Sequence, residues 1–225
     1  IGGEVRLGAM LFTLVEPHRG HEVAYNRWYE RDHFYAGCMV GPWLFAGRRF
    51  VATRALKDLR FGTEVDIFGG ADLGSYVAIY WVLEGKHDEH FGWGLRQVRW
   101  LHENNRMFPE RDHTHTLLYR YEGMARADAD GVPAELALDH PYGGVTATLI
   151  RRAAGVDVAA LHQHVIDHTS PELDLAFSPI PLPPNAPVTQ QGQDRLADCV
   201  LTLAFSSGSP ADRWDDHRAA AARLH

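Results

Sequence analysis

The fold is decided by residues 21–56, which read HEVAYNRWYERDHFYAGCMVGPWLFAGRRFVATRAL. This stretch predicts a helix, a tight turn at Gly41-Pro42 and a strand, because proline removes a backbone donor and disfavours helical geometry in the residue before it. Four residues of the helix recur at three- and four-residue steps and are expected to share one face: Tyr25, Trp28, Tyr29 and Asp32. We expect the rest of the chain to build a pocket over this helix.

The first half of the chain predicts six elements in the order strand, helix, strand, strand, helix, strand. They fall at residues 7–15, 21–40, 44–56, 76–83, 87–107 and 114–121, and residues 57–75 are too irregular for a regular element. This order is that of the split βαβ, or ferredoxin-like, arrangement. Two helices would cover one face of a four-stranded sheet, and the other face would need a partner.

The second half predicts a shortened copy of the first. Strands are expected at residues 145–151 and 199–205 and helices at 158–167 and 211–224, whereas the proline-rich residues 177–188 fit an edge strand or a surface loop. The Asp32-His33 pair of the first helix recurs as Asp167-His168 near the end of the third.

We therefore predict an α+β protein built from two fused ferredoxin-like βαββαβ halves whose sheets pack together as an antiparallel α/β barrel. The first half spans residues 1–123, a linker spans 124–142, and the second half, which lacks a fourth strand, spans 143–225.

The composition excludes several classes of protein. The 225 residues are 45% hydrophobic and 23% charged, the balance of a soluble globular protein, and no apolar run is long enough for a membrane span. A net charge of -7 argues against nucleic acid as a partner, since a phosphate-binding surface needs a basic excess. Two cysteines are too few to stabilise a fold by disulfide bonds, so reduced thiols and a cytoplasmic location are expected.

Residues 26–50, NRWYERDHFYAGCMVGPWLFAGRRF, carry a resemblance to a known family. A Trp-Tyr pair, acidic residues, a histidine, a glycine-containing turn and an arginine-bearing strand resemble the signature of the dimeric α/β-barrel superfamily, particularly its EthD-like branch. The resemblance implies the fold and a pocket between helices and sheet. It leaves the reaction open, because relatives act as cyclases, cofactor-free monooxygenases, isomerases, dehydratases and haem enzymes.

Three residues are candidates for catalysis. His33, which the resemblance places at the pocket, could move a proton near pH 7 because a neutral imidazole has a pKa near 6.5. Tyr29 and His113 could hold a developing oxyanion. Each also has another interpretation. His33 could cap the end of its helix, Tyr29 could fill the edge of the core, and His113 could form a metal-binding pair with His115.

Seven further residues are candidates for contact with a substrate. Arg48 and Arg49 point to opposite faces of their strand, so only one can reach the pocket. His113 and His115 alternate on their strand and are expected to share a face, but a metal site would lack a third ligand, so no metal is expected. The substrate-binding candidates are Tyr25, Trp28, Tyr35, Arg48, Trp81, His115 and Tyr119.

The function predicted from these residues is a cofactor-independent enzyme that uses histidine acid-base chemistry on a small hydrophobic, oxygen-bearing cyclic molecule. The reaction would be of the lyase, cyclase, dehydratase or isomerase type. One alternative is a haem- or O2-dependent oxidoreductase (monooxygenase) on the same scaffold, with haem as the cofactor. Another is a non-catalytic carrier of hydrophobic ligands. A homo-oligomer remains open.

Overall fold

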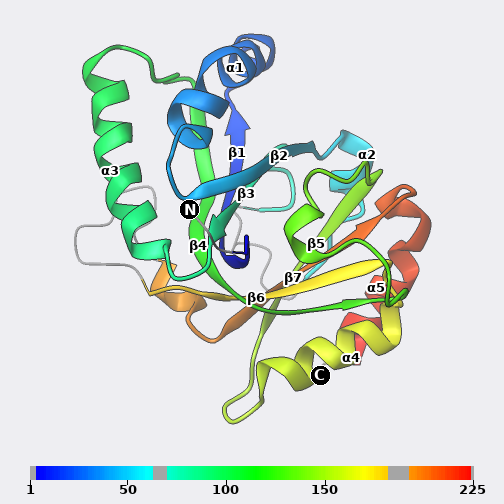
Figure 1. The fold of residues 1–225 in the computed structure, drawn as a ribbon. Helices are drawn as coiled ribbons and strands as arrows, with labels where there is room; N and C mark the ends of the chain where they lie inside the picture. Colours follow the sequence, from blue (N-terminus) through cyan, green and yellow to red (C-terminus); the bar gives the residue numbers. More distant parts are fainter. Residues whose placement is uncertain (1–3, 63–69, 182–192, 224–225) are drawn as a thin grey trace.

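The structure is a computed structural model, and it describes residues 4–62, 70–181 and 193–223 (Figure 1). The first half contains β1 (Leu7–Pro17), α1 (Glu22–Trp28), η1 (Tyr29–Met39), β2 (Leu44–Val51), α2 (Arg54–Asp58), β3 (Tyr76–Leu83), α3 (His87–Glu103) and β4 (Arg111–Arg126). The second half contains η3 (Ala134–Leu136), β5 (Gly144–Arg151), α4 (Val158–Thr169), β6 (Leu173–Pro179), η5 (Gln193–Leu196), β7 (Cys199–Ser206), η6 (Pro210–Arg213) and α5 (Trp214–Ala222).

The strands form one seven-stranded antiparallel sheet in the order β2-β3-β1-β4-β6-β7-β5. The first four strands have the ferredoxin-like order, and β6-β7-β5 repeats three of its four positions, so the predicted fold class is confirmed. The halves join edge to edge, because β4 pairs with β6 along residues 119–126. The sheet curls into a half-barrel, so the two inner faces share one core without stacking as separate sheets.

The strand β6 corrects the expectation for residues 177–188. Leu173–Pro179 pairs with β4 on one side and with β7 on the other, so this strand is central. The prolines misled the prediction because they follow the strand: Pro179 is its last residue, and residues 182–188 lie outside the described part of the chain. The strand predicted at residues 44–56 is also shorter than expected. It ends at Val51, and the Thr53 side chain then caps the short helix α2.

Part of the segment predicted as a linker, residues 124–142, lies inside the half-barrel. Its first three residues belong to β4, and Ala134, Ala137, Leu138 and Tyr142 are buried in the core on the inner face of the sheet. Small and aromatic side chains of this segment thereby supply the partner that the inner sheet face requires.

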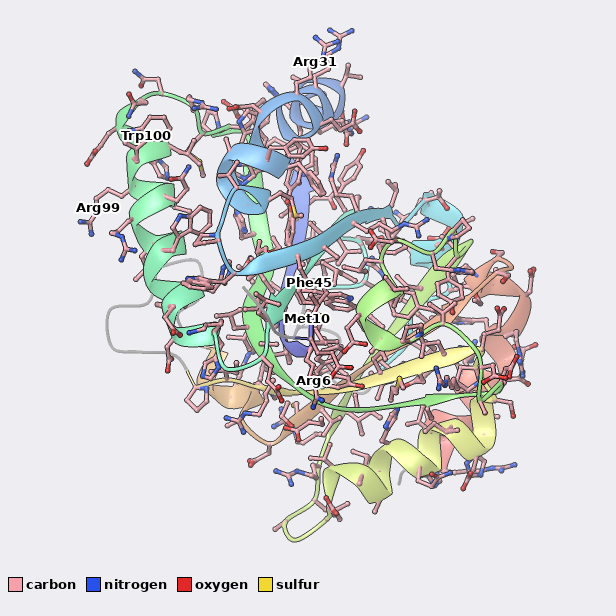
Figure 2. All side chains as sticks on the ribbon, viewed as in Figure 1. Arg6, Met10, Arg31, Phe45, Arg99 and Trp100 are labelled. Atoms are coloured by element: carbon pink, nitrogen blue, oxygen red, sulfur yellow. The ribbon has the colours of Figure 1, made fainter. Side chains whose placement is uncertain are left out.

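The helices cover the outer face of the sheet. The helices α1 and α3 lie beside the first four strands, and α4 lies beside β6 and β7 (Figure 1). Side chains of α1, η1 and α3 pack on the first four strands, and those of α4 pack on β6 and β7. Met10 lies in the interior, whereas Arg31, Arg99 and Trp100 point away from the helices (Figure 2). Among the described helices none is both long and apolar enough to cross a membrane.

Candidate active site

The helix that follows β1 changes its winding at Tyr29. The segment η1 is a π-helix, and the amide of Val40 at its end donates to the carbonyl of Tyr35, a five-residue step, at 3.0 Å. Single π turns are frequent at functional sites, and an eleven-residue segment is long for this geometry. Gly37 leaves room for the His33 ring, because a Cβ at this position would lie 2.4 Å from Cε1 of His33.

The aromatic residues predicted on this helix form one cluster. The ring centroids of Tyr25, Trp28 and Tyr29 lie 5.6–5.9 Å apart. Phe108, from the segment between α3 and β4, packs on Trp28 at 5.7 Å. Asp32 turns aside to form an ion pair with Arg106. The cluster therefore holds η1 against the outer face of the sheet, which is the location that the resemblance implies for a pocket.

His33 lies inside this cluster. Its ring stacks on Trp28 at 4.3 Å and meets Tyr29 edge-on at 5.2 Å. Its Nδ1 atom is buried without a hydrogen-bond partner among the described residues. Burial, followed by the positive charge of Arg111, lowers the pKa of His33 to about 3, so the imidazole is neutral at pH 7.

The structure separates His113 from His115, which corrects the prediction that they share a face. His115 is paired with Leu14, but His113 is paired with the next residue, Val15, so Thr114 is an extra residue in a β-bulge. His115 therefore faces the inner core, where its Nε2 lies 2.8 Å from the hydroxyl of Tyr119. His113 faces the helices on the side of His33.

The ring of His113 is fixed by two hydrogen bonds. Arg111 Nε donates to its Nε2 at 3.3 Å, and its Nδ1 lies 2.9 Å from Oγ1 of Thr116. Since the Thr116 hydroxyl already donates to the carbonyl of His115, it accepts from His113, which carries its proton on Nδ1. Burial lowers the pKa of His113 to about 4, in agreement with this neutral tautomer.

The two strand arginines lie on opposite faces, as predicted, but the one chosen as a substrate contact faces away from His33. Arg48 donates to the carbonyls of His140 and Tyr142 in the inner segment. Arg49 faces η1, with its guanidinium 4.2 Å above the Tyr29 ring. The Nε of Arg49 is buried without a partner among the described residues.

The remaining predicted residues divide between core and surface. Tyr29 donates to, or accepts from, the Tyr80 hydroxyl at 2.6 Å, and burial raises its pKa well above the usual value. Tyr25 is buried beside it. Trp81 and Tyr119 belong to the inner core, with the Trp81 indole donating to the carbonyl of Ala134 at 3.1 Å, and Tyr35 is 61% exposed. The structure thus brings together Tyr25, Trp28, Tyr29, His33 and His113 and leaves apart Tyr35, Arg48, Trp81, His115 and Tyr119.

Arg111 is the residue that sequence reasoning missed. Its guanidinium lies 4.7 Å from the centre of the Trp28 ring, and burial lowers its pKa. Within the described ranges no carboxylate forms an ion pair with it; Asp32 pairs with Arg106, and Glu30 pairs with Arg49. The available signal was its alternation with His113, two residues along the same strand.

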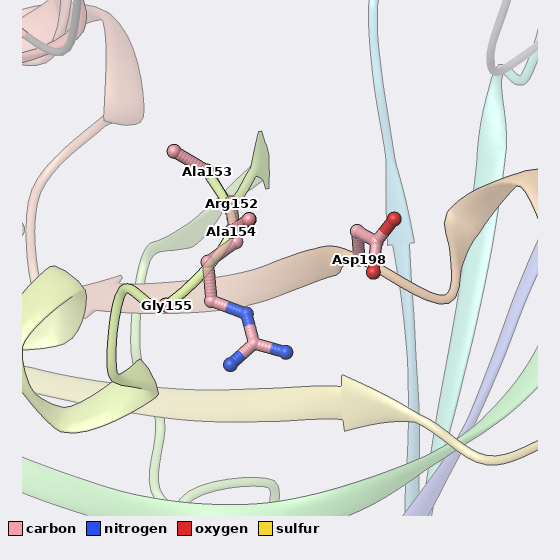
Figure 3. Close-up of a pocket in the computed structure, with 5 residues that line it drawn as sticks. All are labelled: Arg152, Ala153, Ala154, Gly155 and Asp198. Carbon is pink, nitrogen blue, oxygen red and sulfur yellow. The ribbon is translucent and has the colours of Figure 1, made fainter.

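A small hollow in the second half is lined by Arg152, Ala153, Ala154, Gly155 and Asp198 (Figure 3), and this lining carries no aromatic or imidazole ring. In the described part of the chain, no group of three or more His, Cys, Asp or Glu side chains could hold a metal ion.

The three candidate histidines, His33, His113 and His115, lack the free or supported ring nitrogens that haem ligation needs. A histidine that binds a metal almost always donates its second ring N–H to a carbonyl, carboxylate or water. Nδ1 of His33 is buried without such a partner, and both nitrogens of His113 are already engaged by Arg111 and Thr116. His115 lies on the inner face with Nε2 bonded to Tyr119.

Comparison with known proteins gives a likeness of fold. No protein-family profile and no curated protein matches the sequence. A crystal structure of a candidate monooxygenase from Fusobacterium nucleatum superposes with a TM-score of 0.51 at 9% identity, covering 95% of this chain and 81% of that one. A candidate monooxygenase from Lactobacillus acidophilus gives a TM-score of 0.42 at 8% identity, covering 96% of this chain and 86% of that one. The first likeness agrees with the α/β-barrel class, and the EthD-like branch stays a prediction.

Proposed function

We propose that this protein is an oxidoreductase of the monooxygenase type that binds the anionic form of a hydrophobic, oxygen-bearing cyclic molecule beneath η1. One observation carries the proposal: Arg111 is a partly buried cation, packed on Trp28, without a carboxylate partner among the described residues. A buried charge without a counterion is costly, and an anionic ligand would remove that cost. Arg49, with its buried Nε unpartnered, would be the second contact.

The state of His33 supports this choice over the acid-base reaction predicted from the sequence. A general base works best with a pKa near the working pH, but the pKa of His33 is lowered to about 3. A neutral imidazole of this kind is a weak base and a competent hydrogen-bond partner for a substrate oxygen. The name of the Fusobacterium protein, a candidate monooxygenase with the same fold, favours oxidation as well.

The chemistry needs no strong base, because two guanidinium groups would stabilise a phenolate or enolate over its neutral form. The enolate would react with O2 at the adjacent carbon, and the resulting hydroperoxide would lose water. A CH2 group and O2 would thus give a carbonyl group and H2O. The substrate supplies all four electrons, so we propose that the reaction requires neither haem nor another reductant.

The test is oxygen consumption by the purified protein with a panel of hydroquinones, anthrones and cyclic 1,3-diketones. Arg111→Met and Arg49→Met are expected to lower kcat/KM on the order of 100-fold, the effect of losing one donor to an oxyanion. Arg120→Met is the matched control, since Arg120 is exposed on the same strand. Equal activity of all three variants would overturn the arginine assignment.

Two other outcomes would overturn the proposed reaction. Tight binding of these molecules without oxygen uptake would identify a carrier. A Soret band in the absorption spectrum of the purified protein, lost with oxygen uptake in His33→Ala, would identify a haem enzyme.

A further inference from the structure

The helix α4 carries a pair of histidines that the proposed function does not use. His164 and His168 stand four residues apart, so their side chains lie one above the other on the helix. Their ring centroids are 4.4 Å apart, with an angle of 35° between the ring planes. Both side chains are partly exposed and belong to the second half, on a helix remote in sequence from η1.

His168 is held in the tautomer that metal binding requires. Its Nδ1 lies 2.7 Å from the carbonyl oxygen of His164, so Nδ1 carries the proton and donates it. The lone pair is therefore on Nε2. A backbone carbonyl on the second nitrogen is the usual support of a metal-binding histidine, because it fixes both the tautomer and the ring orientation.

His164 has a nitrogen that lacks a partner. Its Nε2 is buried, and none of the described residues forms a hydrogen bond with it. A buried polar atom left unpaired costs about 1–3 kcal/mol, so a group that bonds to it would be stabilising. The neighbouring His168 ring provides the second nitrogen from which such a group could be held.

We propose that His164 and His168 together bind one divalent transition-metal ion through their Nε2 atoms. Imidazole pairs favour Cu2+, Ni2+ and Zn2+ over Mg2+ and Ca2+, which prefer oxygen ligands. Water would complete the coordination, since the described part of the chain contains no third histidine, cysteine or carboxylate for this site. His162 is not a ligand, because its Nε2 is bonded to the buried Asp174 at 2.8 Å.

The position of the pair on the helix adds to the affinity. His168 lies in the last turn of α4, which ends at Thr169, and the C-terminal end of a helix attracts positive charge. A metal that bridges residues 164 and 168 would hold this last turn closed. Because α4 packs on β6 and β7 through Leu161 and Val165, the site would stabilise the second half of the fold.

The test is titration of the purified full chain with NiCl2 by calorimetry, together with thermal unfolding with and without Ni2+. His164→Ala and His168→Ala are each expected to weaken the tightest Ni2+ binding on the order of 10- to 100-fold and to abolish the rise in Tm. His102→Ala is the matched control, because His102 is exposed on α3. It removes one histidine while leaving the pair intact, and it should bind Ni2+ as the wild type does.

Electron paramagnetic resonance of the Cu2+-loaded protein gives an independent readout. The proposal expects coupling to two imidazole nitrogens in the wild type and to one in each α4 variant. Unchanged Ni2+ affinity in both α4 variants, or a loss in the His102 control of the same size, would overturn it. His164→Gln replaces His164→Ala if the latter fails to fold.

Discussion

At the scale of single residues, the charge on His33 is set by its neighbours. Burial is the first cause that lowers its pKa to about 3, and the positive charge of Arg111 is the second. Replacing Arg111 with Met removes the second cause only, so the pKa of His33 is expected to rise while remaining below 6.5. An NMR titration of the His33 ring proton measures this shift. Arg120→Met should leave the titration unchanged, and an unshifted pKa in Arg111→Met would show that the two groups do not interact.

The same residues show what a sequence can predict about a site. The spacing of Tyr25, Trp28, Tyr29 and His33 was sufficient to bring their rings together on one helix. The partner of that helix was not predictable in detail, because one extra residue in β4 rotates His113 toward it and His115 away. Strict alternation along a strand assigns both histidines to one face, and no residue type in this strand marks the bulge.

At the scale of the element, the π-helix depends on a glycine. Gly37→Ala would place a methyl group 2.4 Å from Cε1 of His33, so the ring must move or the helix must rewind. We expect a loss of about 1–3 kcal/mol in the free energy of unfolding, the usual effect of overpacking. Urea unfolding followed by tryptophan fluorescence measures it.

The control for this change is Gly94→Ala in α3, where an added Cβ meets nothing within 4 Å. There the better helix propensity of alanine should stabilise the protein by up to about 1 kcal/mol. Stabilisation by both substitutions would mean that the His33 ring is free to move and that η1 does not require a glycine.

At the scale of the whole molecule, the pseudo-repeat was predictable from the sequence and the burial of residues within the predicted linker was not. Strand and helix order identified the two halves, because each element has its own hydrophobic period. The polar, proline-containing composition of residues 124–142 indicates a linker, yet the structure buries part of it. Its burial depends on long-range contacts, such as those of Arg48 with the carbonyls of His140 and Tyr142, which no local pattern encodes.

Arg48 therefore has a testable structural role. Arg48→Met would leave two backbone carbonyls of the inner segment without their donors, and we expect a loss of about 2–3 kcal/mol in the free energy of unfolding. Substrate affinity should be unchanged, because Arg48 lies across the sheet from His33. Urea unfolding and substrate titration distinguish the two effects, and weaker substrate binding at unchanged stability would restore Arg48 to the site.

Acid should unfold this protein through its buried histidines. Burial lowers the pKa of His33 to about 3 and those of His90 and His113 to about 4, whereas the same side chains in the unfolded chain have a pKa near 6.5. Below pH 6.5 the unfolded state therefore binds more protons than the folded state, and stability falls as the pH falls toward about 4. Each histidine contributes up to about 1.4 kcal/mol per pH unit in this window.

One buried group acts in the opposite direction. Burial raises the pKa of Asp174, so the folded state holds its proton more tightly and gains stability as the pH falls. The effect of three histidines outweighs that of one carboxyl group, so the free energy of unfolding still falls with the pH. Over two pH units this loss is comparable with a total stability of about 5–15 kcal/mol. Urea midpoints measured from pH 8 to pH 5 test the slope. His90→Leu should make this slope shallower, and His102→Gln, at an exposed position, should leave it unchanged. A midpoint that stays constant or rises toward pH 5 would mean that these imidazoles are protonated in the folded protein.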